Sequence, residues 1–203
     1  MSPEDFAGLV GGRLAHVTPA ANLAGIEAEG LLPAAEIARR AGVEARPLRE
    51  KVERLRWGER EAVLNHQMPL RAGRDKDFLD GIKVEAWARL LDERVFLWPE
   101  ARGAAFAASL PGAATLWLDA RRALEALGSD LWLSPINSGS ATRRPARRGA
   151  WLYVSATASV EEFRENRRRR GLIAGRDTVA EVSVTRAIAP AELAALRVEG
   201  PAG

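Results

Sequence analysis

The chain has 203 residues, of which 47% are hydrophobic, and this size fits one domain with its own core. No apolar run approaches membrane-spanning length, and the start, MSPEDFAGLVGG, has acidic residues where a signal peptide has basic ones, so we expect a soluble, cytoplasmic protein with no membrane partner. The net charge is only +3, the absence of cysteine excludes disulfides and thiol catalysis, and two histidines 50 residues apart argue against a metal site.

The first predicted unit is a strand followed by a helix. Residues 13–16 predict a short strand that ends in His16. Thr18 is expected to cap the helix with its hydroxyl and Pro19 to take the first helical position, while Gly30 is expected to end the helix in a left-handed conformation.

Residues 33–92 are expected to form a mostly helical insertion. The part before residue 57 predicts two short charged helices, separated around Gly42 and Pro47. His66 is expected in a loop, since it has no partner at metal-ligand spacing. The end of the segment predicts a helix with one apolar face, made by Val84, Trp87, Leu90 and Leu91.

Strands become frequent after residue 92. The predicted strands are ERVFLWP, ATLWLD, SDLWLSPIN, GAWLYVS and TVAEVSVTRAI. Helices are expected after Pro99, over ARRALEAL, and after Ser159, which can form a capping box with Glu162. This order predicts an α+β fold in a single domain over 1–203. No GxGxxG follows a strand and no GxxxxGK[ST] occurs, so neither a Rossmann site nor a P-loop is indicated.

Four short motifs carry a family resemblance. HVTPAANLAGIEAEGL resembles the opening of the DarT-type DNA ADP-ribosyltransferases, and VAEVSVTRAIAP resembles the stretch with their catalytic glutamate. LSPINSGSA falls where those enzymes have a D-G-N-A turn. The order of histidine, aromatic strand and late glutamate resembles the branch of the ADP-ribosyltransferase fold with a histidine–tyrosine–glutamate pattern, although Phe96 stands at the tyrosine position. The chain is also similar to a poorly characterised bacterial family with the patterns Q-M-P-L, R-V-F-x-W, S-P-x-N-x-G and A-E-x-x-V.

The resemblance covers about residues 13–190 and implies a split mixed sheet and NAD as substrate. It implies that Glu181 is catalytic, because a fixed carboxylate stabilises the oxocarbenium-like transition state of NAD cleavage. His16 would bind the adenosine-side ribose, and Thr18 would shape the nearby backbone or contact the ligand. Phe96 and Trp98 would line the nicotinamide slot. Arg71 and Arg94 are candidate diphosphate or ribose clamps, and the turn of Asn137, Gly139 and Ser140 would approach the ligand.

Each of these residues also has a structural explanation. A single buried histidine is usually satisfied by a backbone carbonyl, and aromatic strand residues usually belong to a core. Glu181 shares its strand face with Val179, Ser183 and Thr185, where a lone glutamate usually pairs with an arginine such as Arg186 or Arg94. The surrounding motifs favour the ligand-binding interpretation.

The acceptor is expected to be DNA or RNA. Residues 141–176 contain ten arginines and three glutamates, a local charge of +7 that suits an anionic partner. The candidate nucleic-acid-binding residues are Arg143, Arg144, Arg147, Arg148, Arg167 and Arg168, with Trp151, Tyr153 and Phe163 able to stack on bases. However, the chain has 27 arginines and three lysines, so a general preference for arginine on a solvated helix explains the run equally well.

Three functions remain open at this point. The first is an NAD-dependent mono-ADP-ribosyltransferase, for which the resemblance also suggests a cognate antitoxin as partner. The second is an RNA 2′-phosphotransferase, a related fold that uses NAD, although its pattern depends on histidine and arginine and not on a late glutamate. The third is an inactive nucleic-acid-binding module, favoured by the loss of the tyrosine hydroxyl.

Overall fold

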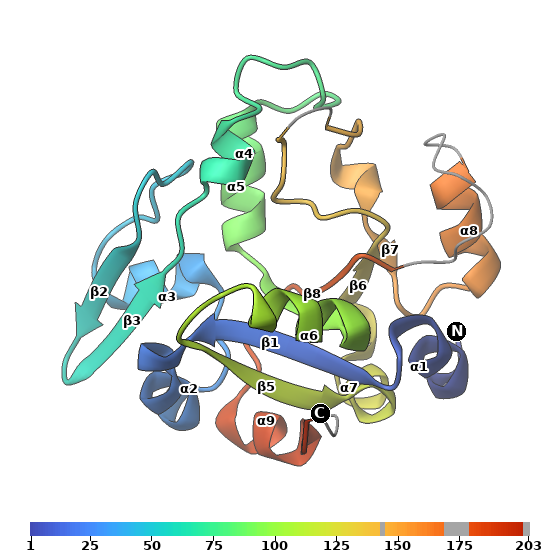
Figure 1. Ribbon diagram of the computed structural model, residues 1–203, viewed down its shortest axis with the longest axis horizontal. Coiled ribbons are helices and arrows are strands. Elements are labelled where there is room, and N and C mark those ends of the chain that lie inside the picture. The colour runs from blue at the N-terminus through green and yellow to red at the C-terminus, as the bar shows by residue number, and fades with distance from the viewer. Residues whose placement is uncertain (143–144, 169–178, 201–203) are drawn as a thin grey trace.

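The computed structural model of the protein describes residues 1–142, 145–168 and 179–200. It has the expected α+β class, with one seven-stranded sheet, a separate two-stranded hairpin and helices around both (Figure 1). The strands are β1 (Arg13–Pro19), β2 (Glu53–Trp57), β3 (Arg60–Leu64), β4 (Val95–Pro99), β5 (Ala113–Asp119), β6 (Leu131–Ser134), β7 (Val154–Ser155), β8 (Glu181–Val184) and β9 (Arg197–Val198).

The helices connect and cover these strands. They are α1 (Pro3–Val10), α2 (Leu23–Glu29), α3 (Ala34–Arg40), α4 (Met68–Arg71), α5 (Val84–Asp92), α6 (Glu100–Ala108), α7 (Ala120–Leu127), α8 (Val160–Arg168) and α9 (Pro190–Leu196). Short 3₁₀ turns are η1 (Ala20–Asn22), η2 (Gly128–Asp130) and η3 (Ala150–Leu152). Among the helices that the structure describes, none has both the length and the apolar character needed to cross a bilayer.

The large sheet has the strand order β7-β6-β8-β4-β1-β5-β9. Every strand pairing within the described residues is antiparallel, so the predicted mixed sheet is wrong in this respect. In the middle of the sheet, β1 and β4 pair only at Leu14–Pro99 and Ala15–Trp98, whereas β1 and β5 pair along seven residues. Beyond Ala15, β1 therefore leaves its neighbour, and side chains can enter the space between them.

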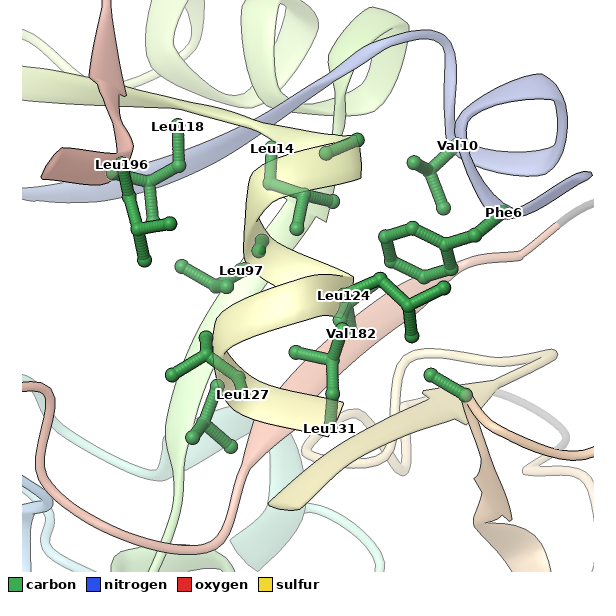
Figure 2. Packing of buried hydrophobic residues seen from close by; sticks show 14 of the residues in the cluster. Phe6, Val10, Leu14, Leu97, Leu118, Leu124, Leu127, Leu131, Val182 and Leu196 are labelled. Atoms are coloured by element: carbon green, nitrogen blue, oxygen red, sulfur yellow. The ribbon is translucent and has the colours of Figure 1, made fainter. Parts of the chain in front are cut away.

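The main hydrophobic core lies under the sheet, on the side covered by α1, α7 and α9. Figure 2 shows Leu124 and Leu127 of α7 among Leu14, Leu97 and Val182 of three adjacent strands. A second cluster is built on α5, where Val84, Trp87, Ala88 and Leu91 are buried, as the apolar face of this helix predicts. Phe96 of β4 and Trp132 of β6 pack against this second cluster, so α5 packs on the sheet through it.

The insertion differs from its prediction. Residues 53–64 form the β2–β3 hairpin, which stands beside the large sheet (Figure 1), and not the second charged helix. Arginine and glutamate favour helices locally. Here, however, alternate residues such as Leu55 and Trp57 are less exposed than their arginine neighbours, a period of two that suits a strand, and Gly58 supplies the turn with a φ of 55°.

The first strand is longer than predicted. Thr18 and Pro19 belong to β1, and α2 begins only at Leu23, so neither residue starts the helix. The polar partner of Thr18 is Asn22, whose side-chain amide donates to the threonine hydroxyl at 2.9 Å. Helices follow Pro99 and Ser159 as predicted, and the Ser159 hydroxyl accepts from the backbone N–H of Glu162 at 3.0 Å, which is one half of the predicted capping box. Of GAWLYVS, only Val154 and Ser155 form a strand.

Gly30 ends α2 as expected, but its φ of 81° and ψ of −168° are those of an extended conformation that favours glycine, and not of the left-handed helical one. Replacing Gly30 with alanine should lower the free energy of unfolding by about 1–3 kcal/mol or more, because an added Cβ would lie 2.0 Å from the Ile188 carbonyl oxygen. Chemical denaturation measures the loss. Gly8→Ala in α1 is the matched control, since its Cβ would meet nothing within 4 Å and should stabilise the helix slightly. Equal effects of the two substitutions would contradict this assignment.

Candidate functional site

A cleft of about 310 Å³ opens between β1, the loop after β3, α5, β4 and the turn after β6. It collects many of the residues singled out from the sequence, namely His16, Thr18, Arg94, Phe96, Trp98, Asn137, Gly139 and Glu181. A smaller hollow of about 60 Å³ adjoins it and shares His16, Thr18 and Asn22. Residues from the two ends of the chain therefore meet in one place.

His16 and Glu181 reach the cleft from strands that are not neighbours. β4 lies between β1 and β8, so the sheet separates the two residues by one strand. The His16 side chain lies where β1 leaves β4, and its Nδ1 donates to the Phe96 carbonyl at 3.0 Å. The imidazole thus takes the place of a backbone N–H of β1 as the donor to the Phe96 carbonyl. This hydrogen bond joins β1 and β4 where their backbone pairing has ended.

Burial of the His16 ring favours its neutral form. Burial lowers the pKa of His16 below its ordinary value of 6.5, and the bond to Phe96 only partly opposes this shift. A carbonyl can only accept, so Nδ1 carries the ring proton and Nε2 is left as an acceptor. Nδ1 of His16 therefore has the backbone-carbonyl partner that a structural histidine usually has, while Nε2 can accept from a ligand hydroxyl.

Glu181 is only 3% exposed, yet it lines the cleft. Its Oε1 accepts from the Ser138 hydroxyl at 2.6 Å and its Oε2 from the Ser138 backbone N–H at 3.3 Å. Burial raises the pKa of Glu181 to about 7, against the lowering effects of Ser138, Arg148 and Arg94. Such a carboxyl can exchange a proton near neutral pH.

The surface ion pair that would explain a strand glutamate is absent among the described residues. Arg186 donates instead to Asp130 and Glu192 at the other end of the strand. Arg94 donates to the Ser183 hydroxyl at 3.0 Å and influences Glu181 only through its charge. Glu181 is therefore a buried carboxyl without a paired cation, a costly arrangement that is typical of functional sites.

The turn that holds Glu181 is supported by Arg148. This arginine is 2% exposed, and its guanidinium donates to the carbonyls of Asn137, Ser138 and Ser140 at 2.9–3.0 Å. The Trp87 indole N–H also donates to the Ser138 carbonyl. Arg148 was predicted to bind nucleic acid, and this is wrong, because its side chain is buried and its Nε and Nη1 donate to backbone carbonyls inside the protein.

Ser138 was not identified from the sequence, although it lies within the S-P-x-N-x-G pattern. Replacing Ser138 with alanine should raise the pKa of Glu181 above about 7, because the hydroxyl stabilises the charged form of the carboxyl. Carbon-detected NMR of the labelled side chain measures this titration. Ser140→Ala is the control, since the Ser140 hydroxyl contacts Thr142 and not the carboxyl. A Glu181 pKa that stays the same or falls in Ser138→Ala would contradict this role.

Tyr153 is the only tyrosine of the chain and lies beneath Arg94. The guanidinium carbon is 4.0 Å from the centre of the ring, and Trp87 stacks on the ring with 6.2 Å between centroids. Burial raises the pKa of the Tyr153 hydroxyl far above its ordinary value. Tyr153 and Phe163 are buried and cannot stack on bases as predicted, whereas Trp151 is 42% exposed.

Phe96 and Trp98 lie on one side of β4 and line the cleft together, as their alternation predicts. Trp98 is supported from behind by Phe106, with 4.9 Å between ring centroids. Asn22 fixes the opposite wall, because its side chain donates to the Val63 carbonyl and accepts from the Val63 N–H like a neighbouring strand. The hairpin is thereby attached to the end of β1.

The wall nearest α5 rests on a buried ion pair that the sequence did not indicate. Arg49 donates to both carboxylate oxygens of Asp92, at 2.7 and 2.8 Å. Gln67 donates to Asp92 at 3.0 Å and accepts from the backbone N–H of Leu48 and of Arg49. The Gln67 of Q-M-P-L thus has a structural role at the base of the cleft.

Several predicted site residues lie elsewhere. Arg71 pairs with Glu50 at 2.6 Å, and neither Arg71 nor Ser140 lines the cleft. Arg147 pairs with Asp77 and Asp80, and Arg168 pairs with Glu161 and Glu165, so their charges are largely compensated. Arg167 lies in α8, while Arg143 and Arg144 fall outside the described residues.

Comparison with known proteins identifies a family whose function is unknown. A family model described as a "Family of unknown function (DUF7002)" matches residues 12–194, a range that includes both His16 and Glu181. No curated protein matches the chain.

Proposed function

Because the chain belongs to the DUF7002 family, whose function is unknown, we propose from the site itself that the protein is an NAD-dependent mono-ADP-ribosyltransferase. One observation carries this proposal. A neutral histidine and a buried carboxyl with a pKa of about 7, which lie 165 positions apart in the sequence, line one cleft with Phe96 and Trp98. This set provides an acceptor for a ribose hydroxyl, aromatic rings for a planar nicotinamide and a carboxylate for developing positive charge.

The proposed reaction breaks the bond between C1′ of ribose and the nicotinamide nitrogen. The bonding electrons leave with nicotinamide, and positive charge develops on the sugar. The ionised Glu181 carboxylate stabilises this charge within a partly water-excluded site. A bond then forms between C1′ and an oxygen or nitrogen of the acceptor, whose proton passes to Glu181 and afterwards to water.

The fold supports the same proposal. The sheet divides where β1 leaves β4, and the cleft begins at this division with the histidine on one side and the glutamate strand on the other. The split that the resemblance implies is thus compatible with this sheet, whose pairings are antiparallel. We further propose that the acceptor is a nucleic acid and that an antitoxin restrains the enzyme. The acceptor proposal rests on the overall arginine content of 141–176. It does not rest on Arg147 and Arg168, which are ion-paired, or on Arg148, which is buried.

The experiment is incubation with NAD labelled in the adenylate, together with DNA, RNA or cell lysate, beside His16→Ala. Nicotinamide release with label on one acceptor class, lost in His16→Ala, is expected. Label retained at the wild-type level in His16→Ala would contradict the site. Consumption of NAD only with 2′-phosphorylated RNA would identify the phosphotransferase alternative. Oligonucleotide binding that weakens steeply with salt, without a thermal shift from NAD, would identify the inactive binding module.

A further inference from the structure

Both histidines of the chain line the cleft, although they are 50 residues apart and only one belongs to a recognised motif. His16 extends from β1, while His66 lies in the loop between β3 and α4, on a different wall. The sequence predicts His66 to be an ordinary loop residue. Its exposed side chain at the cleft suggests a contact with a ligand.

The two imidazoles present opposite chemistry. His16 donates from Nδ1 to a carbonyl and therefore leaves Nε2 as an acceptor. His66 accepts at Nδ1 from the Met68 backbone N–H, at 3.3 Å, so the proton of its neutral ring is on Nε2. The cleft thus offers one imidazole acceptor and one imidazole donor.

The loop that carries His66 is anchored on both sides of this residue. The carbonyl of Asn65 accepts from Arg49 at 3.1 Å. The backbone N–H of Gln67 donates to the Arg49 carbonyl at 2.7 Å, and its side chain donates to Asp92. Arg49 and Asp92 are buried and are joined by two hydrogen bonds, so they hold the loop in position. A donor held in this way is preorganised for binding.

Few charged residues line the cleft, and each of the arginines among them has an internal contact. Among the described lining residues other than the histidines, the cationic side chains are Arg49 and Arg94 and the acidic ones are Asp92 and Glu181, so the cleft has no large excess of either charge. Arg49 is already engaged with Asp92, and Arg94 with Ser183 and the Tyr153 ring. Arg71, the other candidate clamp, pairs with Glu50 outside the cleft. A diphosphate in the cleft would therefore gain from a further donor beside the guanidinium of Arg94.

We propose that His66 is a ligand-contacting residue that donates from Nε2 to a phosphoryl oxygen of the dinucleotide's diphosphate. The choice of ligand rests on the proposed function, whereas the donor and its position come from the geometry of the loop. The inference concerns binding and places no chemical step on His66.

The first test is NMR of the imidazole nitrogens in the whole protein, which has only two histidines to resolve. At constant pH, the free protein should show a protonated Nδ1 for His16 and a protonated Nε2 for His66. Addition of ADP-ribose should shift the His66 Nε2 signal, whereas adenosine and nicotinamide, which lack phosphate, should not. His66→Gln assigns the signal by its disappearance.

The second test is the affinity for ADP-ribose by calorimetry. His66→Ala should weaken binding about 10-fold or more, the effect of losing one hydrogen bond to a charged group. His66→Gln should recover most of the loss, because its amide nitrogen can take the place of Nε2. The affinity for adenosine should not change in either variant. Met68→Ala is the matched control, since it is exposed beside the loop and keeps the backbone N–H that orients His66.

The outcomes separate this inference from the proposed function. ADP-ribose that binds His66→Ala as tightly as the wild type would overturn the inference and leave the enzyme proposal standing. If neither NAD nor ADP-ribose binds the wild type, the proposed function fails, and inorganic pyrophosphate becomes the probe. A pyrophosphate-dependent shift of the His66 signal would then support a phosphate-binding role, and its absence would overturn the inference.

Discussion

Replacing Glu181 with glutamine is expected to lower the rate of NAD cleavage by about 10²–10³-fold or more, the usual effect of removing a group that stabilises transition-state charge. Glutamine keeps the size of the side chain and can still accept from the Ser138 hydroxyl, but it carries no negative charge. Nicotinamide release measures the rate. Glu27→Gln, at an exposed position of α2 outside the cleft, is the control and should retain wild-type activity.

The pH dependence of this reaction follows from the same carboxyl. Since burial raises the pKa of Glu181 to about 7 and the ionised form is the active one, kcat/KM should fall about tenfold per pH unit below this value and level off above pH 8. Ser138→Ala, which raises the pKa of Glu181 further, should move this acid limb to higher pH. A rate that is independent of pH between 5 and 8 would contradict the assignment.

As pH rises, the free energy of unfolding should fall while the activity increases. The pKa of Glu181 is raised in the folded protein, so its stabilising contribution is complete below its ordinary pKa of 4.5 and is lost as pH rises through about 7. Above pH 7, Glu181→Gln removes the cost of an ionised buried carboxylate and should unfold at the same or a higher denaturant concentration than the wild type. An inactive and strongly destabilised variant would indicate a structural role for Glu181.

Replacing Asp92 with alanine is expected to lower the free energy of unfolding by about 3–5 kcal/mol, because it leaves the buried Arg49 without its counter-charge. Arg49 cannot reach water without moving the loop that lines the cleft, since it also donates to the carbonyls of Asn65 and Arg46. Urea unfolding measures the loss. The affinity for ADP-ribose should fall as well, because this ion pair supports the loop of His66.

Two variants control for this result. Arg49→Leu combined with Asp92→Leu removes both charges and should recover much of the lost stability, since a well-packed apolar pair often replaces a buried ion pair without loss. Glu161→Ala breaks the exposed pair with Arg168 in α8 and should cost less than about 1 kcal/mol. A similar cost for Glu161→Ala and Asp92→Ala would show that burial does not determine the contribution of the pair.

Much of the sheet could be predicted from short patterns. RVFLW and AEVSV alternate or concentrate apolar residues over a few positions, and both form strands where expected. The β2–β3 hairpin was missed because its arginines and glutamates also favour helices, and the packing of Leu55 and Trp57 decides between the two. Thr18 was misplaced because a threonine before a proline looks like a helix cap, whereas here it continues a strand.

Residues of the candidate site could be predicted only where they belong to a recognisable sequence motif. His16, Phe96, Trp98 and Glu181 belong to short recognisable patterns, and all four line the cleft. Ser138 occupies an unspecified position of the S-P-x-N-x-G pattern, and Arg49 and His66 belong to no pattern, so each of the three has many ordinary explanations in the sequence alone. Arg148 shows the reverse error, since an arginine in a basic run was expected on the surface and is buried beneath the turn that it supports.

The amino-acid sequence by itself determined most of the strands of the large sheet, most of the helices around them and the identity of the residues that resemble a catalytic pair. These features follow from periodicity and turn chemistry, which act over a few neighbouring residues. Only the tertiary structure decided that β4 separates His16 from Glu181 and that Ser138 holds the carboxyl. It also decided that Arg49 and Asp92, 43 positions apart, form the base of the cleft. Burial and charge compensation depend on partners that are distant in the chain, and these partners exist only once the strands have paired.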